Sequence, residues 1–394
     1  MTLKTLDTLD VAGKRVLVRV DFNVPLEDGQ VADDSRIQAA LPTIQYLLDH
    51  GAAVLLASHL GRPNGQINPD YSLKPVSEYL SSLIDGPVTF ATDVVGESAQ
   101  QVARDLKPGD VALLENVRFE PGEEKNERAF AQKLAALADL YVNDAFGAAH
   151  RAHASTAAVA ELLPGAAGLL MANEAEVLGR VLSDPDGPLV VILGGAKVSD
   201  KIGVIEAFIR KADSILIGGG MANTFLAAQG IKVGRSLVEK DKIDVARSLI
   251  TQANDAGVEL LLPVDIAIAP SLDESAAHQI ISVTQSVGDE MILDIGPDTV
   301  KLFDAWIGRA GTIVWNGPMG VFEKPPFDAG TRGVAAAVAV ADGFSIVGGG
   351  DSIAALQKLD LADQINHVST GGGASLEFLE GQTLPGLAAL EAGQ

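Results

Sequence analysis

The segment most informative about the fold spans residues 189–201, which read LVVILGGAKVSDK. Five consecutive aliphatic residues indicate a strand that is covered on both faces, as strands of parallel sheets are. A glycine-rich turn that contains two lysines follows the strand directly. Glycine allows backbone amides to approach phosphate closely, so the segment predicts a buried parallel strand that ends at a turn suited to an anionic ligand.

The same pattern recurs on both sides of this segment. Short apolar runs that predict buried strands are found at 16–20, 53–57, 111–114, 215–217, 260–262, 313–315 and 344–347. Amphipathic segments that predict helices lie between them, for example at 127–140, 241–253 and 329–341. Alternation of strands and helices along the whole chain indicates an α/β protein with parallel sheets.

The length of 394 residues favours two large domains. A cluster of turn-forming residues, SDPDGP at 183–188, follows the helical segment 172–182 and precedes the strand at 189–193. We therefore expect an N-terminal domain over 1–170, a hinge helix over 171–185 and a C-terminal domain over 186–375.

The charge balance excludes some partners. The chain has 29 Lys and Arg against 52 Asp and Glu, a formal net charge of −23. Such an acidic surface repels polyanions, so we expect no nucleic-acid partner and no membrane surface as a partner. The chain has no cysteine, which excludes disulfides and thiolate chemistry and fits a reducing compartment. We find no apolar segment typical of a signal peptide or membrane span, and we expect a cytoplasmic protein.

Several common catalytic motifs are absent from the sequence. It contains no G-x-x-x-x-G-K-[ST], no G-x-G-x-x-G, no G-x-S-x-G and no H-E-x-x-H. The P-loop route to phosphate binding is therefore excluded, and a dehydrogenase, an α/β-hydrolase or a zinc protease is disfavoured.

In the first half of the chain, cationic and polar residues gather where the expected strands end. They occur in the segments 19–25, 58–63, 115–119 and 143–153, and in a helix start at 33–36. Ligands of open α/β sheets bind beyond the carboxyl ends of the strands, so these loops predict one pocket for a small, multiply charged anion. Each arginine alone could equally cap a helix or pair with a surface acid. Asp33 and Asp34 are expected to cap the helix, with Arg36 exposed in its first turn.

In the second half, glycine-rich turns follow the expected strands at 194–195, 218–220 and 348–350, and another precedes a helix at 371–373. Four such turns suggest the phosphate chain of a nucleotide. Lys197 and Lys201 would share one face if they lay on a helix, and Asp351 could hold the Mg²⁺ carried by a nucleotide. A tight turn is the alternative for each glycine cluster, and a rigid loop is the alternative for the irregular segment 315–323.

Together these segments resemble the phosphoglycerate kinase family. The resemblance rests on residues 19–25, 58–65, 115–119, 143–156, 193–201, 315–323, 348–352 and 369–375, and it extends over nearly the whole chain in the same order. It implies two Rossmann-like domains joined by a helical hinge, and a tail over 376–394 that returns to the N-terminal domain. Ala148 departs from the family pattern, which often has a hydroxyl residue there, but it touches none of the implied contacts.

The resemblance also implies site residues. The implied phosphoglycerate-binding residues are Asp21, Phe22, Asn23, Arg36, His59, Leu60, Gly61, Arg62, Arg118 and Arg151. The implied nucleotide-binding residues are Lys201, Asn316, Glu323, Gly350, Asp351, Ser352 and Ile353, with Glu323 at the ribose and Asp351 as the ligand of Mg²⁺. The implied groups that stabilise the transferring phosphoryl are Arg36, Lys197 and the backbone amides of Gly371 and Gly372.

The implied activity is reversible, Mg-dependent phosphoryl transfer from 1,3-bisphosphoglycerate to ADP, which yields 3-phosphoglycerate and ATP in glycolysis. The attacking carboxylate of the reverse reaction is already ionised at neutral pH, so no general base is required. Ligands on two domains require domain closure before in-line transfer. The family further implies a monomer. The alternatives from the sequence are a non-catalytic two-domain protein that binds an anionic metabolite, and a dehydrogenase without the usual fingerprint.

Overall fold

The computed structural model describes residues 3–273 and 278–391. Its contacts divide the chain into an N-terminal unit, which comprises residues up to Glu176 and those from Thr383 onward, and a C-terminal unit, Val177–Gln382. The first division falls inside helix α5 (Leu169–Ser183), where we expected a separate hinge over 171–185. Residues 376–382 belong to the C-terminal unit, although we expected them in the tail, and 392–394 of that tail lie outside the described residues.

The N-terminal unit is built on a six-stranded sheet with the order β5-β6-β4-β1-β7-β8, in which all pairs are parallel. A short antiparallel hairpin, β2-β3, lies outside it. The elements of this unit besides α5 are η1 (Leu6–Thr8), β1 (Arg15–Arg19), β2 (Leu26–Glu27), β3 (Gln30–Val31), α1 (Ser35–Asp49), β4 (Ala53–Ala57), η2 (Pro69–Tyr71), α2 (Lys74–Leu80), β5 (Val88–Phe90), α3 (Glu97–Asp105), β6 (Val111–Leu113), η3 (Val117–Phe119), α4 (Arg128–Ala135), β7 (Leu140–Asn143), η4 (Phe146–Ala148), η5 (Ala158–Glu161), β8 (Gly165–Ala167) and α13 (Pro385–Ala388).

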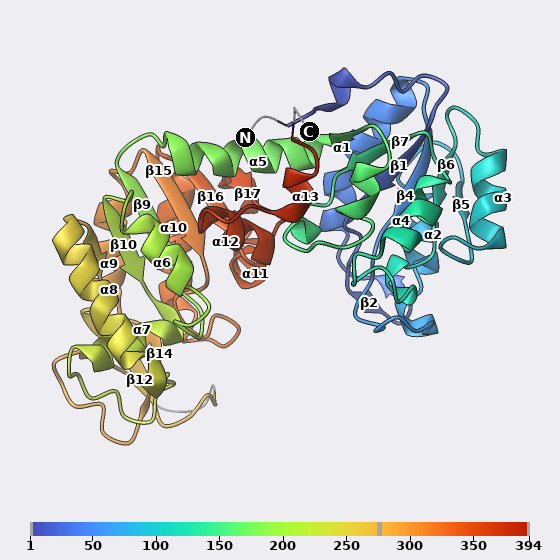
Figure 1. Cartoon of the computed structure of the whole chain (residues 1–394). Coiled ribbons are helices and arrows are strands. Elements are labelled where there is room, and N and C mark those ends of the chain that lie inside the picture. Colours follow the sequence, from blue (N-terminus) through green and yellow to red (C-terminus); the bar gives the residue numbers. More distant parts are fainter. Residues whose placement is uncertain (1–2, 274–277, 392–394) are drawn as a thin grey trace. The chain divides into compact units, whose positions relative to one another are not determined.

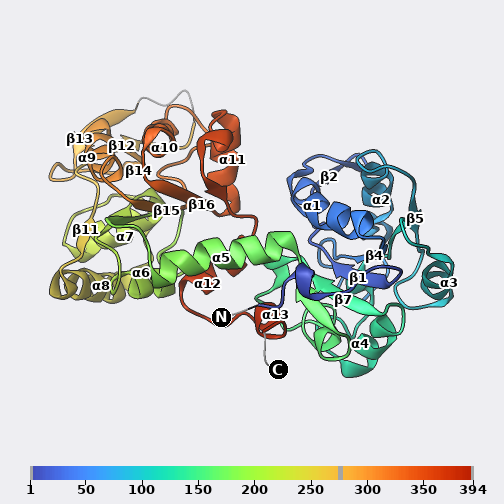
Figure 2. The same cartoon turned by 90° about the horizontal axis from the view of Figure 1, so that it is seen from above.

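Helices cover both faces of this sheet (Figure 2). Alternate residues of β1, Val16 and Val18, are fully buried in one core with Ile37 and Ile44 of α1 and Val76 of α2. The residues between them point to the opposite face, where α4 lies (Figure 2). This double cover explains why the strands read as continuous aliphatic runs.

The C-terminal unit repeats this architecture with a parallel sheet of order β11-β10-β9-β15-β16-β17 (Figure 1). It adds an antiparallel sheet, β13-β12-β14. Its elements are β9 (Leu189–Leu193), α6 (Ile202–Phe208), β10 (Ser214–Ile217), α7 (Gly219–Ala228), η6 (Lys240–Lys242), α8 (Ile243–Ala256), β11 (Glu259–Leu261), β12 (Asp265–Ala269), β13 (Gln279–Ser282), β14 (Met291–Ile295), α9 (Pro297–Ile307), β15 (Thr312–Asn316), α10 (Ala329–Val340), β16 (Phe344–Gly348), α11 (Gly350–Lys358), η7 (Ala362–Gln364), β17 (His367–Val368) and α12 (Gly373–Leu379).

The core of the C-terminal unit lies between its parallel sheet and helices α9, α10 and α11. Trp315 on the central strand β15 is fully buried there, against Phe303 of α9 and Val334 of α10. Burial of such large side chains stabilises the fold by about 1.5–3 kcal/mol for each aliphatic or aromatic group. The strand ends are thereby held on a fixed frame.

The α/β fold with two parallel sheets is confirmed, and the strands expected at 53–57 and 189–193 have the expected bounds as β4 and β9. The helix expected over 127–140 was too long, because α4 ends at Ala135 and Leu140 already begins the buried strand β7. The antiparallel sheet was not predicted.

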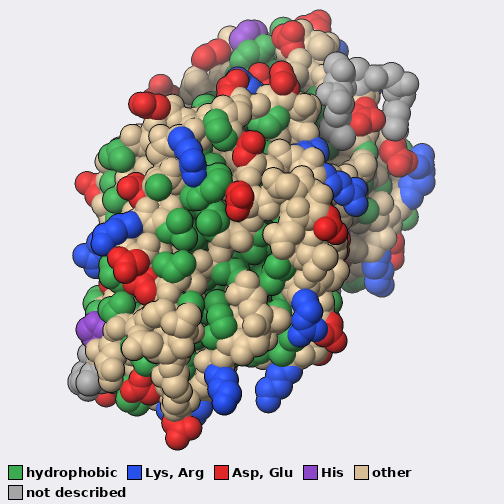
Figure 3. Space-filling view, turned by 90° about the vertical axis from the view of Figure 1, so that its left-hand side faces the viewer, with side chains coloured by type: hydrophobic (Ala, Val, Ile, Leu, Met, Phe, Trp, Pro, Cys, Tyr) green, Lys and Arg blue, Asp and Glu red, His purple; other side chains and the backbone are tan. Residues whose placement is uncertain are grey.

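The helices of the described residues are too short or too polar to cross a membrane. On the face of the C-terminal unit drawn in Figure 3, acidic and basic side chains are dispersed among apolar ones. That face has no continuous basic area of the kind that binds a nucleic-acid backbone.

Candidate active site

The first candidate site belongs to the N-terminal unit and lies where four parallel strands end. The segments after β1, β4, β6 and β7 meet at this edge of the sheet, because parallel strands all present their carboxyl ends on one side. Predicted site residues occur in all four segments, and Arg36 joins them from the first turn of α1.

Asp21 and Arg36 form the best-connected pair of this site. Arg36 Nη1 lies 3.5 Å from Asp21 Oδ2 and donates a 2.9 Å hydrogen bond to the carbonyl of Asn23. The expectation that Arg36 is exposed was wrong, because its side chain is 34% exposed and spans from α1 to the loop after β1. The guanidinium therefore has a fixed position with part of its donor set free.

The two aspartates before α1 differ in their contacts. Asp33 accepts a 2.9 Å hydrogen bond from the amide of Ser35, as expected of a capping residue. Asp34 occupies the N-cap position, but its side chain makes no cap bond. Its carboxylate instead accepts hydrogen bonds from Gln38 and Tyr79, which lower its pKa. Asp34 therefore ties α1 to α2 instead of capping the helix with its side chain.

The segment after β4 is fixed by contacts with the segment after β1. The amide of Gly61 donates a 2.8 Å hydrogen bond to Asn23 Oδ1, and the amide of Phe22 donates one of 2.8 Å to Ser58 Oγ. Gly61 has a φ of +59°, and a Cβ there would lie 2.4 Å from the ring of Tyr71. Glycine is therefore required at this position of the site.

Arg118 is the most deeply buried of the predicted arginines, at 4% exposed. Its Nη1 donates a 2.7 Å hydrogen bond to the carbonyl of Gly61, and its Nε lies 3.3 Å from Glu124 Oε1. Burial lowers the pKa of Arg118 to about 10, and the nearby Arg151 contributes to the lowering. The guanidinium is still charged at neutral pH and acts as a fixed cation below the surface of the site.

The remaining predicted residues of this unit differ in exposure. His59, Phe22 and Leu60 are buried, whereas Arg62 is exposed. Arg151 is half-buried, and its Nε donates a 3.0 Å hydrogen bond to His150 Nε2. The site therefore combines the buried cation Arg118 with cations that reach solvent, and a small ligand with several negative charges fits such a set.

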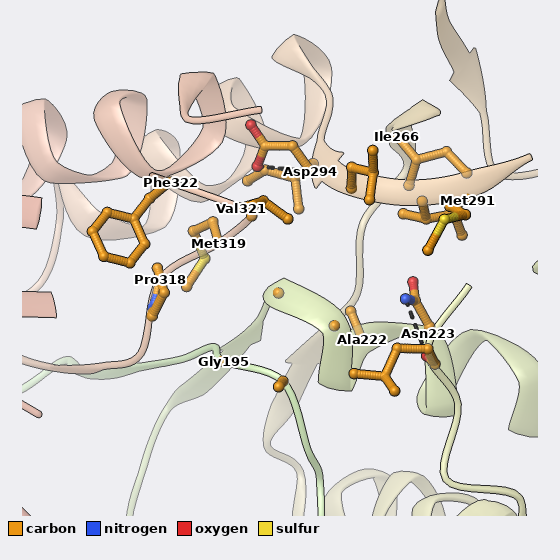
Figure 4. A pocket seen from close by; sticks show the side chains of 18 of the residues that line it. Gly195, Ala222, Asn223, Ile266, Met291, Asp294, Pro318, Met319, Val321 and Phe322 are labelled. Atoms are coloured by element: carbon orange, nitrogen blue, oxygen red, sulfur yellow. Dashed lines mark hydrogen bonds between the residues drawn. The ribbon is translucent and has the colours of Figure 1, made fainter. Parts of the chain in front are cut away.

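The second candidate site is a cavity of about 350 Å³ in the C-terminal unit. In Figure 4, Gly195, Ala222 and Asn223 lie on one side of it and Met291 and Asp294 on the other. The segment Pro318–Phe322 closes one end. Apart from its glycine turns the wall is mostly apolar, which suits a flat, uncharged ring better than a phosphate.

Two predicted carboxylates, Glu323 and Asp351, line this cavity and are exposed. Two glycine turns that were singled out in the sequence also line it, through Gly195 and Gly219. Gly219 has a φ of +67°, and a Cβ there would lie 2.6 Å from the backbone of Gly195. Only glycine allows these two turns to approach each other so closely.

Lys201 and Asn316 contact each other directly, the Lys201 ammonium donating to Asn316 Oδ1. Lys201 is 8% exposed. Burial lowers the pKa of Lys201 to about 8, against the opposing attraction of acids that include Asp200 and Asp351. The ammonium therefore changes its charge close to physiological pH.

Lys197 and Lys201 do not share a helix face, so that interpretation was wrong. Helix α6 begins only at Ile202, because residues 198–201 form a turn in which the amide of Lys201 bonds the carbonyl of Val198. Glu239 holds this turn through the amide and hydroxyl of Ser199, at 3.0 and 2.6 Å. Lys197 is left exposed.

The other predicted nucleotide and catalytic residues lie at the starts of α11 and α12. Gly350, Asp351, Ser352 and Ile353 form the first turn of α11, and the buried Ser352 hydroxyl accepts a 2.7 Å hydrogen bond from the amide of Gly317. Gly371 donates its amide to Ser369 Oγ at 3.3 Å. Gly372 is the N-cap of α12. The residues that line the cavity do not include Lys197, Gly371 or Gly372.

The sequence analysis missed two groups of residues. One is the cavity wall, including Leu237, Met291 and Asn223; the buried Asn223 Oδ1 has no hydrogen-bond partner among the described residues. The other is a buried pair beneath the first site, Arg19 and Glu123. Apolar wall residues carry no local signal, whereas Arg19 ends the strand β1 and opens the polar segment 19–25, where no role was assigned to it.

Within the described part of the chain, no three His, Asp or Glu side chains gather closely enough to hold a metal ion. A single exposed carboxylate such as Asp351 can still contribute to a Mg²⁺ site, since Mg²⁺ is commonly bound by one or two carboxylates together with phosphates and water. The donor set therefore fits a metal that arrives with a nucleotide.

A family model described as phosphoglycerate kinase matches residues 6–382. The phosphoglycerate kinase of Moorella thermoacetica is 56% identical over 390 residues, covering 99% of this chain and 99% of the relative. That of Thermomicrobium roseum is 55% identical over 388 residues, covering 98% and 99%.

Two solved structures are similar over nearly the full length. The structure of phosphoglycerate kinase from Coxiella burnetii has a TM-score of 0.91 and 44% identity, covering 98% of each chain. The structure of that from Pyrococcus horikoshii has a TM-score of 0.83 and 36% identity, covering 99% of this chain and 98% of the other.

Proposed function

The chain belongs to the phosphoglycerate kinase family and is a phosphotransferase with a carboxyl group as acceptor, and we propose how its two units divide that reaction. The N-terminal unit binds 3-phosphoglycerate or 1,3-bisphosphoglycerate. The C-terminal unit binds ADP or ATP as a Mg-nucleotide, the form that this family generally uses. The activity belongs to glycolysis.

The observation that carries this division is the contrast between the two sites. The cations Arg36 and Arg118 and the buried imidazole of His59 gather in the N-terminal unit, and hydrogen bonds of 2.9 and 2.7 Å hold the two arginines. A substrate with a carboxylate and a phosphate has the charge for such a site. Asp21 and Asn23 supply the acceptors that orient Arg36 and the backbone of the loop after β4.

The cavity of the C-terminal unit supports nucleotide binding. Its volume and apolar wall suit a nucleobase, and the glycine turns at Gly195 and Gly219 leave backbone amides accessible to phosphates. Glu323, exposed at the cavity, is the proposed acceptor for ribose hydroxyls. Lys201 and Asn316, with Gly350, Ser352 and Ile353 at the α11 turn, are the proposed contacts to the phosphate chain.

Asp351 is the proposed ligand of Mg²⁺, because its carboxylate lines the cavity and is exposed. When bound, Mg²⁺ neutralises charge on the nucleotide phosphates and polarises them toward transfer. Asp351 also raises the pKa of the neighbouring Lys201, so the two groups share one electrostatic environment.

In the proposed reaction, the carboxylate of 3-phosphoglycerate attacks the terminal phosphorus of ATP, the bond from this phosphorus to the bridging oxygen breaks, and ADP leaves; in the opposite direction the acyl phosphate transfers its phosphoryl to ADP and the carboxylate leaves. The carboxylate needs no general base, because it is ionised at neutral pH. Arg36, Lys197 and the amides of Gly371 and Gly372 are the proposed groups that stabilise charge on the transferring phosphoryl. In-line transfer requires closure of the units with both ligands bound, which excludes water. A monomer and a cytoplasmic location remain predictions from the sequence.

Coupled turnover tests this proposal. Formation of ADP from Mg-ATP is followed with and without 3-phosphoglycerate, with a dehydrogenase that consumes the acyl phosphate. The expected result is turnover that depends strictly on phosphoglycerate and is lost without Mg²⁺. ADP formation that is independent of phosphoglycerate would contradict the proposal, and so would binding of both ligands without turnover.

A further inference from the structure

A buried polar network lies beneath the first site and has no role in the reaction described above. Arg19, at the end of β1, is 1% exposed, and Glu123 and Ser155 are 0% and 1% exposed. They come from three separate parts of the N-terminal unit: a strand, the turn after η3 and the segment after β7. A buried arginine and a buried glutamate are costly to desolvate, so their arrangement requires an explanation.

Glu123 and Ser155 fix the orientation of Arg19. Glu123 Oε2 accepts a 2.9 Å hydrogen bond from the amide of Ser155, and Oε1 accepts one of 2.6 Å from its hydroxyl. The hydroxyl oxygen in turn accepts a 2.8 Å hydrogen bond from Arg19 Nε, and Arg19 Nη1 donates to the carbonyl of Val20. Nη2 is the one guanidinium nitrogen that these two contacts leave unused.

That group is His59, whose Nδ1 lies 3.1 Å from Arg19 Nη2. A guanidinium nitrogen can only donate, so Nδ1 must accept and carries no proton. The alternative is a proton on Nδ1 that faces Asp21 Oδ1, but that distance is 3.7 Å, which is too long for a hydrogen bond. A proton on Nδ1 would also oppose the N–H of Arg19. The single ring proton therefore belongs on Nε2.

The charges around His59 favour its neutral form. Burial of the ring lowers the pKa of His59 well below 6.5, and four neighbours add to the lowering: Arg19 of β1, Arg118 of η3, Arg36 of α1 and His153 of the segment after β7. The opposing acids are Asp21, 3.7 Å from Nδ1, and Glu123 behind Arg19.

We propose that Arg19, oriented by Ser155 and Glu123, is a positioning residue that keeps His59 neutral with its proton on Nε2, so that the imidazole meets the phosphoglycerate as a hydrogen-bond donor and not as a cation. The contact of His59 with substrate rests on the proposed function. The protonation state and the tautomer of the His59 ring do not depend on the proposed function, and both can be measured on the protein without substrate.

The first test is nitrogen NMR of the histidine rings in the full chain, with the His59 signals assigned by their loss in His59→Gln. The expected result at pH 7 is an unprotonated Nδ1 and a protonated Nε2, with no titration of His59 between pH 8 and pH 5. A proton on Nδ1, or protons on both nitrogens at pH 7, would overturn the proposal. Because no substrate is present, this outcome is independent of whether the proposed function holds.

The second test is Arg19→Lys, which keeps a cation but replaces the planar guanidinium, whose Nε and Nη2 reach Ser155 and His59 separately, with a single ammonium nitrogen. The expected result is loss of the single tautomer in the NMR spectrum and a rise of roughly tenfold in the KM for 3-phosphoglycerate, with a smaller change in kcat. Arg15→Lys is the matched control, since Arg15 lies on the same strand in a partly exposed ion pair with Asp139 at 3.0 Å. It should leave both readouts unchanged.

A third variant, His59→Gln, tests the role of the ring charge directly. Its amide can donate but is never a cation, so the KM for 3-phosphoglycerate should rise less than in His59→Leu, which offers no donor. Equal losses in the two variants would contradict a donor role for His59. An Arg19→Lys protein that keeps the wild-type tautomer would contradict the positioning role of Arg19, whatever its activity.

Discussion

The two units share one architecture and carry opposite chemistry. Each has a six-stranded parallel sheet covered by helices, and each carries its candidate site on loops between these elements. In the N-terminal unit the site is polar, with Arg118 and His59 buried. In the C-terminal unit it is a mostly apolar cavity with the carboxylates of Glu323 and Asp351 exposed. In the proposed division of ligands, the sheet therefore sets where a ligand binds, and the loop residues set which ligand it is.

The largest effect is expected from the cations of the N-terminal unit. Arg36→Ala should lower kcat by about 10³-fold while the KM for 3-phosphoglycerate changes much less, because the guanidinium is proposed to stabilise charge that develops in transfer. Steady-state kinetics of Arg15→Ala, which removes a partly exposed arginine from the same unit, provide the control. A loss below tenfold in Arg36→Ala would remove the catalytic role from this residue.

A substitution in the cavity wall should weaken binding of the nucleotide without changing binding of 3-phosphoglycerate. Leu237 lines the cavity and is 49% exposed, so Leu237→Asp should leave the fold intact. We expect the Kd for ADP, measured by calorimetry, to rise about tenfold or more from charge repulsion and loss of apolar contact. Binding of 3-phosphoglycerate should not change. The control is Val340→Asp, at a residue that is 77% exposed and outside the cavity; equal losses in both variants would contradict the cavity as the nucleotide site.

A backbone substitution tests how far the polar site depends on close packing. Gly61→Ala places a Cβ 2.4 Å from the Tyr71 ring at a φ of +59°, whereas Gly13→Ala has a φ of +70° and meets nothing within 4 Å. Denaturant unfolding should show Gly61→Ala less stable by about 2–3 kcal/mol and Gly13→Ala by about 1 kcal/mol. Equal destabilisation would mean that backbone strain alone, without the contact to Tyr71, accounts for the glycine.

The smallest effect is a pH dependence confined to the C-terminal unit. Burial lowers the pKa of Lys201 to about 8, so its ammonium is charged below pH 8 and becomes neutral as the pH rises through that value. The KM for ADP should therefore rise several-fold between pH 7 and pH 9, because a neutral amine attracts phosphate less. In Lys201→Arg, which stays charged, the KM for ADP should not rise over this pH range. A pH profile identical to that of the wild type would mean that a group other than Lys201 causes the rise.

The sequence predicted the strands and the loops that carry the site, because aliphatic runs and glycine or arginine clusters are local signals. It did not predict the antiparallel sheet or the turn at 198–201, which is held by Glu239 from a distant segment. It also missed the cavity wall at Leu237 and Met291, because apolar residues become a wall only when remote segments meet. Arg36 was wrongly expected to be exposed because its partners, Asp21 and Asn23, lie in the loop after β1, more than ten residues earlier in the sequence.

The division of ligands between the units is tested most directly by amide chemical-shift mapping of the full chain. 3-Phosphoglycerate alone should perturb the segments after β1, β4, β6 and β7 of the N-terminal unit, and Mg-ADP alone should perturb the turns at Gly195, Gly219 and Asp351. Perturbation of the same unit by both ligands would contradict the account.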